Sequence, residues 1–198
     1  MTTRRVLLRG ALAAGTVALL AGPAFAEDAP DDSQPVHFMI ADINGTIVTD
    51  ETLLGKFSLF YFGYTGCPDI CPTSMLTLSE VLDALGSEAD RVLPIFVTVD
   101  PDRDTPKLLS EYVSAFNQRI VALRGPKAYL DRMVEAFKVK YEFYVPDPKH
   151  PEDYTVDHTA SIIFVGPDGR VIKRFPHGMA TDAIVADVRA ALAAVPAN

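Results

Sequence analysis

Two near-continuous apolar segments constrain the fold of this chain more than any other feature. They are KFSLFYFGY (56–64) and RVLPIFVTVD (91–100), and neither shows the strict polar–apolar alternation of a strand with one face in water. Such runs are typical of strands that are buried on both faces. The sheet that contains them must therefore be covered by helices on both sides.

Helical patterns follow these strands. Apolar residues recur with helical period through the segment 72–85, and the pattern stops at Gly86. Thr105 and Pro106 have the residue types of an N-cap and a first helical position, so a second helix is predicted to begin there. An alanine-rich segment, about 181–194, predicts a C-terminal helix.

The remaining apolar segments complete a mixed sheet. An Asn-Gly pair at 44–45 lies between apolar stretches and predicts an N-terminal β-hairpin with a two-residue turn. IVALRG (120–125) predicts a short strand, and TASIIFVG and RVIKRF flank the turn PDG (167–169). A strand, a cysteine-bearing turn and a helix, followed later by a hairpin and a last helix, is the order of a thioredoxin-like α/β domain with a mixed central sheet flanked by helices.

The N-terminus has a different character. Residues 1–26 contain paired arginines at 4 and 5, an apolar alanine-rich run and the sequence AFA, which are typical of a twin-arginine export signal cleaved after Ala26. Residues 27–35 are predicted to be a linker, and 36–198 the folded domain. The predicted location is the periplasm, or the outer face of the inner membrane if the signal is retained as an anchor.

Charge and compartment narrow the possible functions. Removing residues 1–26 takes away three arginines and no acidic residue, which leaves 15 basic and 26 acidic residues and a net charge of −11. Nucleic acid is therefore not an expected partner. An exported protein enters an oxidising compartment, where two thiols pair unless something reduces or ligates them.

The only two cysteines of the chain, Cys67 and Cys71, lie in GYTGCPDICP. Pro72 has no amide hydrogen and belongs in the first helical turn, so Cys71 is predicted at about the N-cap and Cys67 in the preceding loop. Both sulfurs then lie near the positive end of the helix dipole, which is expected to lower a thiol pKa by about one unit.

Three interpretations of this pair remain open. A structural disulfide across so short a loop contributes only about 2 kcal/mol in the chain-entropy model, less than a long loop would. A dithiol/disulfide oxidoreductase is possible, although the usual redox motif on this fold has one residue fewer between its cysteines. A metal site would use both thiolates and requires a third ligand, preferably an imidazole.

One histidine is placed to be that ligand. His158 is predicted on the loop entering the apolar strand 160–165, and in a thioredoxin-like domain that loop faces the cysteine turn. Two thiolates and one imidazole suit Cu(I) better than Zn(II), whose structural sites take four ligands, and Cu(II) can be held with an added ligand. The other histidines are His37, His150 and His177, the last forming a weak candidate copper couple with Met179.

The segment DPDRDTPKLLSE resembles a calcium loop only superficially. Asp100, Asp102, Asp104 and Glu111 occupy positions 1, 3, 5 and 12, but position 6, which should be glycine, is Thr105. These acids are predicted to order the loop and the start of the helix.

Three motifs in order, GYTGCPDICP, VTVDPDRDT and YTVDHT…FVGPDG, resemble the Sco/SenC family of copper chaperones over residues 36–193. The resemblance implies that Cys67, Cys71 and His158 are copper ligands, with copper as Cu(I) or Cu(II), and that the two cysteines also form a redox disulfide. Asp157, beside the histidine, is predicted to orient its imidazole.

The resemblance also implies partners. Copper would be delivered to the binuclear copper centre of cytochrome c oxidase subunit II, with nitrous oxide reductase as another candidate recipient, and a thioredoxin-like protein would reduce the cysteines. A metallochaperone is expected more than an enzyme. The alternatives are a thiol-disulfide reductase that keeps the recipient's cysteines reduced, and a copper or redox sensor.

Overall fold

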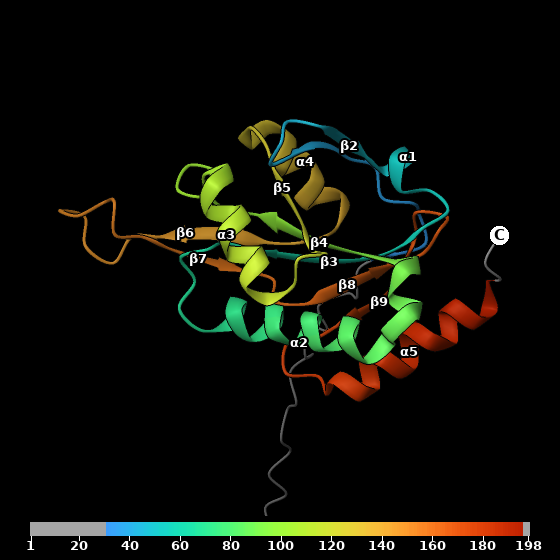
Figure 1. Ribbon diagram of the computed structural model, residues 1–198. Helices are drawn as coiled ribbons and strands as arrows, with labels where there is room; N and C mark the ends of the chain where they lie inside the picture. Colours follow the sequence, from blue (N-terminus) through green and yellow to red (C-terminus); the bar gives the residue numbers. More distant parts are fainter. Residues whose placement is uncertain (1–30, 196–198) are drawn as a thin grey trace, which may run out of the picture.

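The computed structural model describes residues 31–195, which are built around a seven-stranded sheet (Figure 1). Its strand order is β2-β1-β5-β4-β3-β8-β9, and β6 and β7 form a separate two-stranded sheet. The strands are β1 (Met39–Asp42), β2 (Ile47–Thr49), β3 (Phe57–Gly63), β4 (Val92–Thr98), β5 (Val121–Arg124), β6 (Tyr141–Tyr144), β7 (Thr155–His158), β8 (Ile162–Val165) and β9 (Val171–Phe175). The helices are α1 (Asp50–Leu53), α2 (Ile70–Leu85), α3 (Pro106–Phe116), α4 (Lys127–Ala136) and α5 (Thr181–Ala194), with a 3-10 helix at Gly86–Arg91.

The sheet is mixed and covered on both faces. Strands β3, β4 and β5 are parallel neighbours, whereas β8, β9, β1 and β2 pair in antiparallel fashion. The crossovers between the parallel strands place α2 and α3 on one face, where α5 also packs against α2, and α4 lies on the other (Figure 1). This confirms the predicted thioredoxin-like fold.

Strand β3 is buried along its entire length, as its apolar sequence predicts. Successive side chains of a strand point to opposite faces of the sheet. Phe60 and Phe62 share one face and contact Phe137, just beyond α4. The centroid of the Phe137 ring lies 4.6 Å from that of Phe60 and 5.2 Å from that of Phe62. Tyr61 points to the other face, which carries α2. Aromatic residues therefore fill the space on both sides of the strand that leads to the cysteines.

The predicted N-terminal hairpin is present, but its turn is longer than expected. The connection between β1 and β2 comprises residues 43–46, four residues instead of two. One Asp42 carboxylate oxygen accepts hydrogen bonds from the backbone amides of Asn44 and Thr46, each 2.8 Å long, and Gly45 has a φ of +85°. The aspartate side chain therefore shapes the loop that the Asn-Gly pair alone would have closed more tightly.

Helix α1 and the strands β6 and β7 were not predicted. Helix α1 is a single turn, capped by reciprocal contacts between Thr49 and Thr52. Strands β6 and β7 pair in antiparallel register to form a ribbon that extends from the body at the end where α2 begins (Figure 1). The second strand of this ribbon ends at His158.

The described part of the predicted linker, residues 31–35, lies along β9. Arg174 forms an ion pair with Asp32 at 2.6 Å, and Arg170 donates a hydrogen bond to the carbonyl of Ser33 at 3.0 Å. The predicted export signal and residues 27–30 lie outside the described residues. Within residues 31–195, no helix combines the length and apolar character that crossing a membrane requires.

Candidate metal centre

The two cysteines lie where β3 passes into α2. Cys67 is in the connecting loop, and Cys71 is the second residue of the helix, whose N-cap is Asp69. The prediction that Cys71 is the N-cap was therefore wrong by two residues. The first-turn amides have no partner within the helix, so Pro72 is tolerated at the third helical position as well as at the first. The Cys71 amide donates to the Cys67 sulfur over 3.4 Å.

His158 comes from the end of the β6–β7 ribbon and meets the cysteines there. Its Nε2 lies 3.1 Å from the Cys71 sulfur, although the two residues are 87 positions apart in the chain. The two sulfur atoms and one imidazole nitrogen all lie within 4.8 Å of one another. The predicted proximity is thus present, but His158 is the last residue of a strand, and the loop into β8 begins after it.

The imidazole is oriented by a backbone carbonyl. His158 Nδ1 lies 3.1 Å from the carbonyl oxygen of Thr159, which can only accept a hydrogen bond. A neutral imidazole therefore carries its proton on Nδ1, and Nε2 presents a lone pair to the sulfur. The predicted orienting residue, Asp157, is exposed, and strand alternation directs its side chain to the opposite face of the ribbon. Its charge still acts on the imidazole, because it raises the His158 pKa against the stronger effect of burial.

Burial controls the protonation of the centre. Burial, together with a smaller effect of Cys67, raises the pKa of the Cys71 thiol to about 12. The expectation that the helix dipole lowers the thiol pKa was therefore wrong for Cys71, because desolvation of a fully buried thiolate outweighs a dipole effect of about one unit. Burial likewise lowers the pKa of His158 below its ordinary value of 6.5. At neutral pH the metal-free pair is a thiol facing a neutral imidazole.

The two sulfurs differ in their access to solvent. Cys71 is fully buried, whereas Cys67 is half-buried, and both are free thiols. A cleft of about 480 Å³ lies beside the centre and is lined by Cys67 and His158 but not by Cys71. The rings of Tyr61 and Tyr64 contact the imidazole edge-on, each at 6.1 Å between centroids, and fix its tilt.

A glycine missed in the sequence makes room for the buried sulfur. A Cβ atom on Gly63, the last residue of β3, would lie 3.0 Å from the Cys71 sulfur and 3.1 Å from the Tyr61 ring. The end of β3 can approach the helix only because this side chain is absent. Glycine within an otherwise apolar strand was the available signal.

The other histidines lie apart from the cysteines. His37 pairs with Asp50 at 2.8 Å, and His177 Nδ1 lies 3.0 Å from the Ser74 hydroxyl oxygen. His150 is exposed on the loop between β6 and β7 and forms a second group with Glu152 and Asp153, all exposed and without sulfur. Met179, the proposed partner of His177, packs against the core.

Comparisons with known proteins identify the family of this chain. The SCO1/SenC family model matches residues 27–193. A SCO2-like protein of Rickettsia felis is 37% identical over 138 residues, which are 70% of this chain and 67% of that protein.

Solved structures are also similar. Bradyrhizobium japonicum ScoI, solved with copper bound, is 40% identical with a TM-score of 0.71, over 80% of this chain and 99% of that one. BsSco, described as a member of the Sco family of cytochrome c oxidase assembly proteins, is 28% identical with a TM-score of 0.61, over 79% and 92% of the two chains. With the family model covering most of its length, the chain belongs to the SCO1/SenC family.

Proposed function

We propose that this protein binds a single copper ion through Cys67, Cys71 and His158 and delivers it to the binuclear copper centre of cytochrome c oxidase subunit II. The observation that carries the proposal is the convergence of the three donor atoms within 4.8 Å. Two sulfurs and one imidazole nitrogen are soft and intermediate ligands, which favour Cu(I). Structural zinc takes four protein ligands, and the group found within residues 31–195 offers three.

The protonation states suit capture of copper by the reduced protein. His158 Nε2 already carries a free lone pair, whereas Cys71 must lose its proton when the metal binds. A disulfide offers no thiolate, so the redox state of the cysteine pair would control loading. A thioredoxin-like reductant would supply the two electrons that regenerate the thiols.

The relatives support the choice of recipient. ScoI of Bradyrhizobium japonicum is a copper-bound structure, and BsSco is described as a cytochrome c oxidase assembly protein. Nitrous oxide reductase is a second candidate recipient. Delivery would take place in the periplasm after export by the twin-arginine signal, or at the inner membrane if that signal is retained.

A competition titration against a Cu(I) chelator tests the proposal. The reduced protein should bind a single copper ion, and the oxidised protein should not. Three variants each lose one proposed ligand: Cys67→Ala, Cys71→Ala and His158→Ala. Each should weaken Cu(I) binding by more than about 100-fold, because loss of a residue that only supports a ligand already costs about 10–100-fold. His150→Ala, which removes the imidazole of the exposed second group, should leave the affinity unchanged. Unaltered Cu(I) affinity in His158→Ala would refute the three-ligand site.

A thiol-disulfide reductase is the second candidate, favoured by the closeness of two free thiols of unequal burial. The Cys67 thiolate would attack a substrate disulfide, and Cys71 would then release the reduced substrate while forming the Cys67–Cys71 disulfide. Reductase activity that survives His158→Ala at the parent's rate would favour this function over copper delivery.

A further inference from the structure

The ribbon that carries His158 needs an attachment to the body of the protein. Strands β6 and β7 pair with each other and form a sheet of their own, so the seven-stranded sheet does not fix their position through its backbone ladder. Apart from the short connection 159–161 that leads into β8, the distance between His158 and Cys71 therefore depends on contacts made by side chains at the base of the ribbon.

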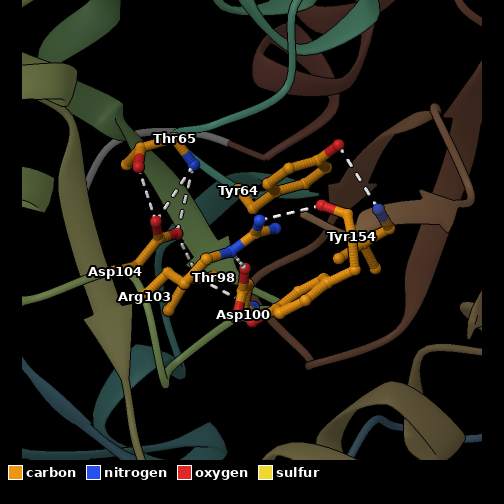
Figure 2. A network of polar contacts seen from close by, with 8 residues as sticks. Tyr64, Thr65, Thr98, Asp100, Arg103, Asp104 and Tyr154 are labelled. Atoms are coloured by element: carbon orange, nitrogen blue, oxygen red, sulfur yellow. Dashed lines mark hydrogen bonds and ion pairs between the residues drawn. The ribbon is translucent and has the colours of Figure 1, made fainter. Parts of the chain in front are cut away.

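Arg103, in the loop between β4 and α3, contacts Tyr154, the residue just before the strand that bears His158 (Figure 2). Its Nε donates to Asp100 over 2.5 Å, and its Nη1 donates to the carbonyl of Tyr154 over 2.8 Å. The guanidinium carbon lies 3.6 Å from the centre of the Tyr154 ring. The Tyr154 hydroxyl in turn donates to the other Asp100 carboxylate oxygen over 2.8 Å. A buried carboxylate, a guanidinium and a tyrosine thus form a closed triangle just before β7.

The same loop also holds the cysteine side of the centre. Asp104 accepts hydrogen bonds from the amide and the hydroxyl of Thr65 and from the hydroxyl of Thr98 (Figure 2). The Tyr64 hydroxyl accepts from the Val156 amide over 3.3 Å and so joins the cysteine loop directly to β7. Two of the four acids of the false calcium motif, Asp100 and Asp104, therefore order this loop, as predicted, whereas Asp102 is exposed and Glu111 pairs with Lys107 on α3. The loop contacts both halves of the candidate metal centre.

We propose that Arg103 is a positioning residue that holds His158 beside Cys71. The inference rests on the proposed function and goes further by assigning the alignment of the third ligand to a residue outside the ligand set. The planar guanidinium bonds the carboxylate and the carbonyl at once and stacks on the ring, which a lysine ammonium cannot reproduce. Tyr154 is four residues from His158, and the paired strands between them transmit its placement.

A thermodynamic cycle tests the inference against a general structural role. Arg103→Lys should weaken Cu(I) binding by about tenfold or more, as loss of a residue that supports a ligand does. In a His158→Ala background the same substitution should change the affinity by less than about twofold, because the two effects are coupled. Tyr154→Phe, which removes only the bond to Asp100, should shift the affinity in the same direction by a smaller factor.

Arg174→Lys is the matched control. Arg174 also pairs with a carboxylate and a backbone carbonyl, those of Asp32 and Phe137, but it does not contact the ribbon. Its substitution should leave the Cu(I) affinity within about twofold of the parent's. An Arg103→Lys effect that persists in full without His158, or one equalled by Arg174→Lys, overturns the inference.

Hydrogen exchange on the reduced, metal-free protein gives a readout that needs no copper. Arg103→Lys should speed exchange of the Val156 amide and of the β6–β7 ladder while leaving β3 and β4 protected, and Arg174→Lys should not. Unchanged ribbon exchange in Arg103→Lys contradicts the inference even if copper binding falls. If the parent itself fails to bind copper, the proposed function is wrong, and exchange alone then decides whether Arg103 holds the ribbon.

Discussion

Gly63 shows how one missing side chain sets the geometry of the candidate centre. Its position at the end of β3 brings the strand against the Cys71 sulfur, the Tyr61 ring and the Phe96 ring, all at 3.0–3.2 Å from a hypothetical Cβ. None of these neighbours is at the free end of a flexible side chain, because all three are buried in the core. A methyl group must therefore displace the sulfur or separate the strand from the helix.

Gly63→Ala is expected to lower the free energy of unfolding by about 1–3 kcal/mol, the usual cost of overpacking. It should also weaken Cu(I) binding, since the sulfur is the nearest neighbour. Urea denaturation and the chelator titration measure the two effects. Gly66→Ala, three residues further along the chain, is the control, because its Cβ would meet only the Tyr64 ring at an ordinary 3.5 Å. Equal effects at both positions would contradict the close-contact argument.

His158 should make the stability of the metal-free protein depend on pH. Burial lowers its pKa in the folded state below 6.5, so the unfolded chain binds the proton more readily. Its contribution is fully present above pH 6.5 and is lost as the pH falls through the lowered folded-state pKa, with a slope of at most about 1.4 kcal/mol per pH unit. Unfolding free energies of the parent and of His158→Gln between pH 8 and 5 isolate the effect. Parallel curves for the two proteins would contradict it.

The start of α2 has an unusual cap. The side chain of the N-cap residue Asp69 accepts no hydrogen bond from the helix. Instead, the Cys67 sulfur accepts a hydrogen bond from the Cys71 amide. A candidate ligand is therefore also a structural acceptor for one of the open amides of the first turn. Substitutions of Cys67 are therefore expected to alter helix stability as well as the proposed metal binding.

Cys67→Ala should destabilise the reduced, metal-free protein by about 0.5–1 kcal/mol, in the range for loss of a helix cap. Cys67→Ser should be at least as stable as the parent, since a hydroxyl oxygen is a better acceptor than a thiol sulfur. Urea denaturation under reducing conditions measures both. If the two variants unfold at the same urea concentration, the sulfur does not cap the helix.

Local sequence pattern was sufficient for the elements whose environment is uniform. β3 and β4 are apolar apart from Ser58 and Thr98 because both faces are buried, and α5 spans the predicted residues 181–194. The ribbon was missed because three of the four residues of β6 are exposed. Its sequence therefore lacks the alternation of buried and exposed positions by which a strand is recognised. Since the ribbon was missed, His158 was assigned to a loop although it ends a strand.

The aromatic core on the α4 side of the sheet ties distant segments together. The Phe137 ring contacts those of Phe38, Phe60 and Phe62, at 5.8, 4.6 and 5.2 Å between centroids. These residues come from the segment before β1, from β3 and from the end of α4. Phe137 therefore stabilises the scaffold from the face opposite the helix that carries Cys71.

Phe137→Ala should lower the free energy of unfolding by about 3–5 kcal/mol, as expected for a large cavity in a core. The midpoint of urea denaturation should fall while the denaturant dependence stays the same. Phe143→Ala provides the comparison, because this ring is 41% exposed on the ribbon and should cost less than half as much. A similar decrease in the free energy of unfolding for both variants would contradict the claim that the aromatic cluster around Phe137 contributes more to stability than the ribbon does.

The proximity of the three candidate ligands could be predicted only from the predicted fold. The spacing of Cys67 and Cys71 is enough to identify them as candidate ligands. His158 is 87 residues beyond Cys71, and no local sequence signal predicts that it lies against a sulfur. The order of strands and helices supplied that proximity. The carbonyl of Thr159 and the guanidinium of Arg103 could not be assigned in this way, because a backbone acceptor and a loop ion pair carry no sequence period.

The unequal burial of the two sulfurs leaves the centre open to solvent on the Cys67 side. A reagent or partner thiol that arrives through the adjacent cleft encounters Cys67, while Cys71 stays sealed beneath the end of β3 and the first turn of α2. Exchange of a bound metal ion would therefore be sequential: an incoming thiol would replace the Cys67 sulfur first, and the Cys71 sulfur would be the last to release the ion.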